Sequence, residues 1–143
     1  MGETPSAVDV ALRALRHRDL SRRELEERLR GKGFGEAERD EALETLGRTG
    51  LVDDRRFAES RARSLAARGA GDAAVRHALG RAGVESEIVE EALETIEPEA
   101  ERVLSVVARR GVGPKTARYL RGKGFSDEVV AGVVAGVSGE ELG

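Results

Sequence analysis

The hexapeptide LRGKGF occurs twice in the chain, at residues 29–34 and again, unchanged, at residues 120–125. A related stretch, LGRAGV, lies between the two copies at residues 79–84. When Leu29, Leu79 and Leu120 are aligned, apolar residues on both sides of them also coincide. The coinciding sets are Leu25 with Val75, Ala42 with Ala92 and Val133, and Leu46 with Ile96 and Val137. The sequence therefore predicts three copies of one unit, in which neighbouring copies share apolar surface.

Each copy has the apolar spacing and the helix-start residues of three short helices. In the first copy, Leu12 and Leu15 mark an opening helix. Ser21 and Glu24 form a capping box that starts a second helix, and a third is expected over residues 36–46. Further helix starts are expected with Asp53 as an N-cap, Pro98 at a first helical position, Pro114 after a glycine, and Ser126.

The Val-rich segment 129–137 is the one stretch whose local propensity also permits a strand, because β-branched residues favour strands and its two glycines weaken a helix. The spacing of its valines matches the helical spacing of the apolar residues in segment 88–96, and it therefore predicts a helix. The expected fold class is all-α, with three tandem three-helix repeats forming an elongated, curved helical body. The expected repeats span residues 6–52, 53–97 and 98–138.

The amino-acid composition limits the cellular compartment in which the chain is expected and the kinds of covalent and metal sites that it can form. The chain of 143 residues has no Cys, so disulfides and thiolate metal sites are not available to it, and a reducing compartment fits. It has no apolar run of about 18 residues and no signal-peptide pattern at its start. We therefore expect a cytoplasmic protein with no membrane contact, and a monomer.

Charged residues fall in blocks of alternating sign. Residues 55–84 carry seven basic and two acidic side chains, and residues 85–101 carry eight acidic and no basic ones. Residues 102–125 carry seven basic and no acidic side chains, and residues 126–143 carry four acidic ones. A single block is most often a solvated helix face, but alternation along a repeat array favours a charged partner.

No catalytic, metal or cofactor site is expected. His17 and His77 fall in different copies with no ligand at metal-binding spacing, and surface positions on helices are expected for both. Neighbouring carboxylates such as Asp53 and Asp54 point in different directions on a helix. LRGKGF lacks the Ser or Thr that follows the lysine of a phosphate-binding P-loop. The sequence therefore indicates a protein that is not an enzyme and has no cofactor.

The segment GVGPKTARYL, residues 111–120, has a rival interpretation. It is similar to the glycine turn of helix-hairpin-helix modules, in which backbone N–H groups at a helix start hold a DNA phosphate. It lacks the usual apolar-Pro lead-in, and the repeat alignment already explains its Gly-Pro as a helix start. A stand-alone DNA-binding protein that uses the basic segment 109–123 therefore stays an open alternative.

LRGKGF itself fits a helix ending. If Gly33 takes the left-handed conformation just after a helix, Leu29 and Phe34 are the two residues that touch in a Schellman motif, and Leu120 pairs with Phe125 in the same way. LGRAGV keeps only the leucine, the glycine and an apolar last residue. The repeated motif is thus predicted to be a structural joint that carries separate basic residues.

Three stretches together resemble one known family. The runs SRRELEERLRGKGF (residues 21–34), GLVDDRRFAESRA (50–62) and YLRGKGFSDEVV (119–130) are similar to the RecX family of bacterial recombination regulators. The likeness covers about residues 8–137, and its most specific element is GLVDD followed two residues later by Phe57 and Ala58.

The resemblance implies a negative regulator of homologous recombination, acting in DNA repair and the SOS response. Its implied partner is the RecA recombinase: family members bind in the groove of the RecA filament on single-stranded DNA and inhibit its ATPase, strand-exchange and co-protease activities. Direct contact with single-stranded DNA is also possible on this view. The basic residues expected to contact RecA or DNA are Arg30, Lys32, Arg55, Arg56, Arg109, Arg110, Lys115, Arg118, Arg121 and Lys123.

Overall fold

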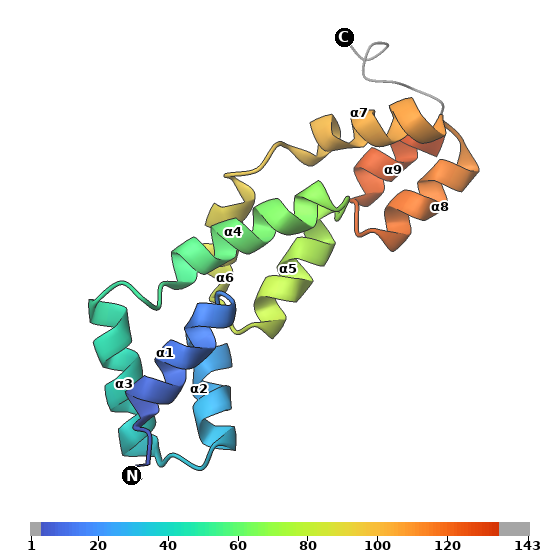
Figure 1. The fold of residues 1–143 in the computed structure, drawn as a ribbon. Coiled ribbons are helices and arrows are strands. Elements are labelled where there is room, and N and C mark those ends of the chain that lie inside the picture. The colour runs from blue at the N-terminus through green and yellow to red at the C-terminus, as the bar shows by residue number, and fades with distance from the viewer. Residues whose placement is uncertain (1–3, 135–143) are drawn as a thin grey trace.

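The computed structural model describes residues 4–134, and within this range the backbone forms nine α-helices and no strand (Figure 1). The first three helices are α1 (Ala7–His17), α2 (Arg22–Gly31) and α3 (Glu36–Arg48). The next three are α4 (Asp54–Ala67), α5 (Asp72–Arg81) and α6 (Ser86–Leu93). The last three are α7 (Glu99–Arg110), α8 (Pro114–Gly122) and α9 (Asp127–Val134). The predicted all-α fold is confirmed.

Each group of three consecutive helices surrounds its own cluster of buried apolar side chains, and we call these groups the first, second and third units. The largest fully buried apolar residues are Leu25, Leu29 and Leu46 in the first, Phe57, Val75 and Leu79 in the second, and Leu120 and Val130 in the third. The unit boundaries expected from the sequence stay a prediction, and residues 135–138 of the last expected repeat, with Val137, lie outside the described part.

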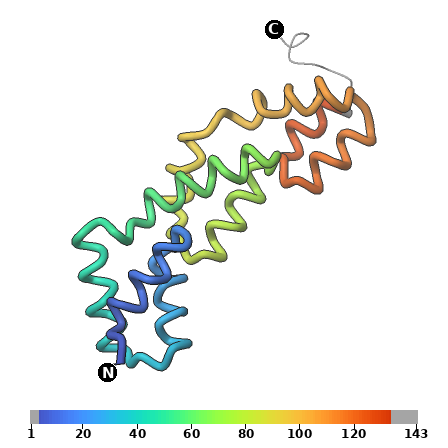
Figure 2. The backbone as a smooth tube through the Cα atoms, viewed as in Figure 1, coloured from blue at the N-terminus to red at the C-terminus, as the bar shows by residue number. Residues whose placement is uncertain are grey.

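The three units follow one another along a curved, elongated body (Figure 1 and Figure 2). The helices α1 to α3 lie at one end and α7 to α9 at the other, with α4 to α6 between them. An array of this kind buries little of its length in any one core, so it presents an extended surface to a partner.

Helix starts follow the expected capping chemistry, with one correction. The Ser21 hydroxyl accepts a hydrogen bond from Glu24 N, and a Glu24 carboxylate oxygen accepts one from Ser21 N, both at 3.1 Å. The Asp53 carboxylate accepts from Arg55 N and Arg56 N, and α4 begins at the next residue. The prediction for Pro98 was wrong by one position: its extended ψ of 147° makes it the N-cap, and α7 begins at Glu99.

The ends of α2, α5 and α8 are Schellman motifs, as the repeated hexapeptide predicts. Gly33, Gly83 and Gly124 have φ values of 94°, 83° and 90°, which favour glycine. In each case the next N–H reaches back to the carbonyl of the aligned leucine, as from Phe34 N to Leu29 O at 3.2 Å. We call residues 32–34, 82–84 and 123–125 the first, second and third joints.

The same ending also occurs in two helices for which it was not predicted. Gly50 and Gly69 have φ values of 79° and 93°, and the residues after them donate to Leu46 O and Leu65 O at 2.9 and 3.0 Å. Both segments carry the pattern of Leu, three residues, Gly and an apolar residue. The pattern is therefore a general helix terminator in this chain.

The third joint holds the third unit against the second. Gly71 N donates to Lys123 O at 2.7 Å and Ala73 N donates to Gly124 O at 3.0 Å, so the start of α5 bonds directly to the joint. A Cβ atom on Gly71 would overlap the backbone of the joint, which explains why the position carries no side chain.

The second joint holds the second unit against the first in a similar way. The buried hydroxyl of Ser21 donates to Ala82 O at 2.5 Å. Arg22 N donates to the Asp54 carboxylate at 2.8 Å across the same boundary. In both junctions a joint meets the turn between the first two helices of the preceding unit. We call these turns, at residues 18–21, 68–71 and 111–113, the first, second and third corners.

Candidate partner-binding surface

Three of the predicted contact residues share the exposed face of α8. Lys115, Arg118 and Arg121 are exposed, while Ala117 and Leu120 on the opposite face are buried in the core of the third unit. No salt bridge to these three cations occurs within residues 4–134. Their positive charge is therefore available to an anionic partner.

Arg110, Arg109 and Lys123 gather around Tyr119. The Arg110 guanidinium lies 3.5 Å from the centre of the Tyr119 ring, a cation–π contact that leaves its charge unneutralised. The Arg109 Nε donates to Ser105 O at 3.3 Å, and Arg109 remains exposed. Lys123 is half-buried, with its side chain beside the second corner. The structure thus brings the six basic residues predicted between 109 and 123 together on the third unit.

The other four predicted residues lie apart from this cluster, and three of them are engaged. Arg30 pairs with Glu26 at 2.7 Å, and Arg55 pairs with Glu91. Arg56 donates to Gly50 O at 2.8 Å. Lys32 is exposed at the first joint, and no salt bridge to it occurs in the described range. The ten residues therefore do not form a single site, and their contact with a partner stays a prediction.

Two N–H groups of the glycine turn before α8 are already bonded within the third unit. Gly111 N donates to Val107 O at 2.7 Å and Gly113 N donates to Val133 O at 3.2 Å, while Pro114 has no N–H. Helix-hairpin-helix phosphate binding depends on such groups pointing at the ligand. The two glycine N–H groups therefore have a structural role, and the N–H groups of Lys115 and Thr116 at the start of α8 have no acceptor among residues 4–134.

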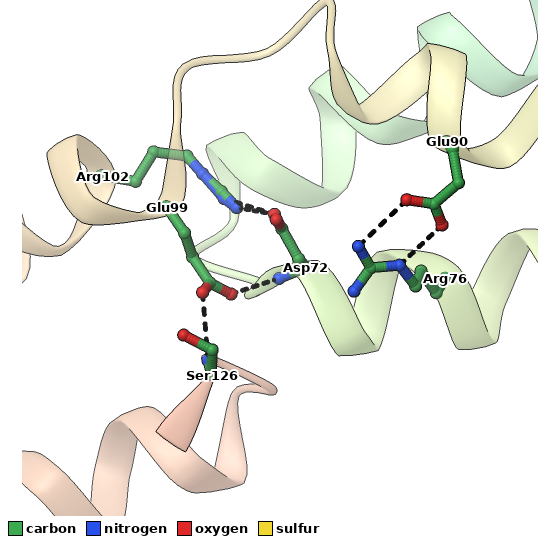
Figure 3. A network of polar contacts seen from close by, with 6 residues as sticks. All are labelled: Asp72, Arg76, Glu90, Glu99, Arg102 and Ser126. Atoms are coloured by element: carbon green, nitrogen blue, oxygen red, sulfur yellow. Dashed lines mark hydrogen bonds and ion pairs between the residues drawn. The ribbon is translucent and has the colours of Figure 1, made fainter. Parts of the chain in front are cut away.

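A polar network between the second and third units was not predicted from the sequence. The Glu99 carboxylate accepts from Asp72 N at 2.7 Å and from Ser126 N at 3.1 Å, so one side chain caps both α5 and α9 (Figure 3). Arg102 pairs with Asp72, and its side chain is only 10% exposed. The only sequence signal for this network was that Asp72 and Glu99 are acidic residues at expected helix starts. Acidic residues also occur there because they stabilise the start of their own helix.

A second ion pair in the same region shifts two pKa values. Arg76 donates from Nε and Nη2 to the two carboxylate oxygens of Glu90 at 2.7 and 3.1 Å (Figure 3). These hydrogen bonds lower the pKa of the Glu90 carboxyl and raise the pKa of the Arg76 guanidinium. The pair joins α5 to α6 within the second unit and neutralises part of the acidic block.

Other kinds of site receive no support from the described residues. His17 and His77 are both exposed, as predicted. Within residues 4–134, no three His, Asp or Glu side chains converge in a way that suits a metal ion. None of the helices in that range combines the length and the apolar character needed to cross a membrane.

Comparison with known proteins gives the family. Residues 7–46 match the model of the first three-helix domain of RecX, and residues 53–93 match that of the second. The regulatory protein RecX of Chromohalobacter salexigens is 37% identical over 136 residues, covering 89% of this chain and 90% of that protein. The protein of the same name from Chlorobaculum tepidum is 35% identical, covering 98% and 93%.

Solved structures agree with the fold. The crystal structure of RecX from Lactobacillus salivarius superposes with a TM-score of 0.77 at 22% identity, covering 90% of this chain and 92% of that one. A second crystal structure of a regulatory protein RecX gives a TM-score of 0.73 at 21% identity. Residues 4–134 share with these structures an array of short helices. The chain belongs to the RecX family of regulatory proteins.

Proposed function

We propose that this chain is a negative regulator of homologous recombination that binds the RecA filament on single-stranded DNA. Binding would inhibit the ATPase, strand-exchange and co-protease activities of RecA. The observation that carries the proposal is membership of the RecX family, whose relatives are named regulatory proteins. An elongated body without a metal cluster in its described part suits a regulator that acts by contact.

The charge distribution supports a docking mode along the filament. The exposed cations of α8 lie at one end of the body, and the acidic block of residues 85–101 covers α6 in the second unit and continues into the first turn of α7. Separated charges of opposite sign orient a protein on a charged polymer. By bridging neighbouring RecA protomers, the chain would favour one filament state over the others that nucleotide turnover requires.

Co-sedimentation with preformed RecA filaments on single-stranded DNA tests the proposal. We expect the chain to pellet with the filament and to stay in the supernatant with RecA alone or with DNA alone. Recovery in the supernatant at several-fold excess of filament over chain would contradict filament binding.

The stand-alone DNA-binding alternative is favoured by one observation, the six basic residues gathered on the third unit. It predicts tight binding of the chain to DNA without RecA, and a steep loss of that binding as salt rises. A gel shift with the chain alone at two salt concentrations separates the two functions, because the RecA proposal needs no such tight complex.

A further inference from the structure

Grooves of the same construction occur in the first and third units. In the first unit, a groove of about 390 Å³ lies between α1 and the first joint, and residues 4–5, which precede α1, also line it. In the third unit, a smaller hollow of about 230 Å³ lies between α7 and the residues around the third joint. The lining residues correspond through the repeat: Val10 with Arg102, Arg13 with Ser105, Ala14 with Val106, His17 with Arg109, Arg28 with Tyr119, and Phe34 with Phe125.

The groove of the third unit is covered by the second corner. Residues 66–69, at the end of α4, form one wall of it, and the start of α5 bonds to the carbonyls of the third joint. Phe125 is only 6% exposed as a result, with the guanidinium of Arg102 over its ring. The segment that covers this groove is therefore a helix–turn–helix corner, whose second helix has Gly71 as its N-cap and begins at Asp72.

The groove of the first unit has no such occupant among residues 4–134. Neither Lys32 O nor Gly33 O accepts a hydrogen bond from a described residue, although the equivalent carbonyls of the third joint each accept one. Phe34 is only partly buried. The same hexapeptide is thus covered by a corner of another unit in the third unit, whereas no corner formed by residues 4–134 covers it in the first unit.

Charge defines which corner fits the first groove. All its charged lining residues are potential cations, namely Arg13, His17, Arg28 and Lys32, and none of them forms a salt bridge within the described part. In the third unit the cation that pairs with Asp72, at the start of the covering helix, is Arg102. Its counterpart in the first groove is Val10, and the cations Arg13 and Arg28 stand at other positions of the lining there. An acidic helix start is therefore the matching chemistry.

A second copy of this chain does not supply that chemistry. Its third corner, at residues 111–113, is not covered by another unit within residues 4–134, and it is followed by Pro114, which has no N–H, and by Lys115, which would repel the basic groove. Arg109 and Arg110 precede the same corner. The charge and the missing donor both argue against head-to-tail association of identical chains.

We propose that the groove between α1 and the first joint binds a helix–turn–helix corner of another protein. The second helix of that corner has a small residue as its N-cap and begins with an acidic one, as α5 does. Its first N–H groups donate to Lys32 O and Gly33 O, and its acid faces Arg13 and Arg28. This site is separate from the basic face of α8 and does not depend on RecA being the partner.

The test is an NMR titration of the isotope-labelled full chain with a synthetic helical peptide. The peptide is alanine-based, about 18 residues long so that it is helical in isolation, and begins Gly-Asp-Ala-Glu. A second peptide of the same composition carries its acidic residues in the last turn. We expect the first peptide to shift the backbone amides of Arg13, His17 and residues 32–34, and the second to shift them at least about tenfold less at equal concentration.

Two charge reversals on α1 provide the matched control. Arg13→Glu, inside the groove, should weaken binding of the first peptide by at least about tenfold, whereas Arg16→Glu, exposed on the same helix but outside the groove, should leave it within about twofold. Equal response to the two peptides, an unchanged affinity in Arg13→Glu, or shifts confined to the other units would each overturn the proposal. Groove shifts that depend on the concentration of the chain alone would assign the groove to a second copy and overturn it too.

Discussion

Phe34 and Phe125 end the same hexapeptide, yet they are buried to different degrees. Phe125 is 6% exposed because the second unit covers it, and Phe34 is only partly buried. We expect Phe125→Ala to lower the free energy of unfolding by about 3–4 kcal/mol and Phe34→Ala by about half as much. Urea unfolding of the two variants beside the wild type measures both losses. Equal losses would show that packing between units contributes nothing at the third joint.

Gly71 is one of two glycines, with Gly124, at which the junction of the second and third units leaves no room for a side chain. A Cβ on Gly71 would overlap the backbone of Gly124 and Phe125, whereas a Cβ on Gly80, in the helix that follows Gly71, would meet nothing. We expect Gly71→Ala to destabilise the chain by about 1–3 kcal/mol, through forced separation of the units. Gly80→Ala should be neutral or stabilising by up to about 1 kcal/mol, because alanine favours the helix. Thermal unfolding of both variants checks this, and a stable Gly71→Ala would contradict the described contact.

The Arg76–Glu90 pair predicts a small pH-dependent contribution to stability. Hydrogen bonds from Arg76 lower the pKa of Glu90 in the folded chain below the ordinary value of about 4.5. The contribution is therefore present above that value and is lost as the pH falls through the lowered pKa. Since both side chains are about half exposed, we expect only about 0.5 kcal/mol.

Glu90→Gln measures this contribution. The variant should unfold more easily than the wild type at about pH 7, and the difference should shrink as the pH falls toward about 3. A difference in unfolding free energy that is the same at both pH values would mean that the effect of the substitution does not come from the ion pair.

For the helices, the features that could be predicted are those set by residues within one turn of chain, and contacts between distant segments could not be predicted. The Schellman endings of α2, α5 and α8 could be predicted because Leu, Gly and the apolar residue act within one turn of chain. The same pattern at Gly50 and Gly69 was equally available and was missed, because only the aligned leucines were used. The Val-rich α9 was predicted correctly from its spacing as far as residue 134.

Contacts between the units could not be predicted. Gly71 N bonds to Lys123 O, and Glu99 caps helices of two units, through backbone groups that every residue possesses. No side-chain pattern identifies which carbonyl a given N–H will meet after folding. Acidic residues in first helical turns and glycines in turns can be recognised in the sequence, but only the packed structure shows that they connect units.

For the whole molecule, the alternating charge blocks predicted a contact surface only in part. The six cations between residues 109 and 123 come together because the end of α7 and all of α8 pack in one unit. Arg55 and Arg56, predicted from the same charge pattern, are engaged with Glu91 and with backbone carbonyls. The partner of Arg55 comes from a segment that lies near it only in the folded chain, whereas the carbonyls that Arg56 meets precede it by five and six residues.

The basic face of α8 predicts a loss of filament binding on charge reversal. We expect Lys115→Glu combined with Arg118→Glu to weaken binding to the RecA filament by about tenfold or more, because both charges are exposed and have no salt bridge in the described range. Arg16→Glu combined with Arg63→Glu is the matched control, because both arginines are exposed, have no salt bridge among the described residues and give the same change of net charge outside the third unit. Equal binding by the two double variants in co-sedimentation would remove α8 from the contact surface.

The ATPase rate of RecA on single-stranded DNA, measured as this chain is titrated in, tests the proposed function most directly. We predict that the rate falls as the chain is added. A rate that stays unchanged at several-fold molar excess of the chain over RecA would contradict its assignment as a negative regulator of RecA.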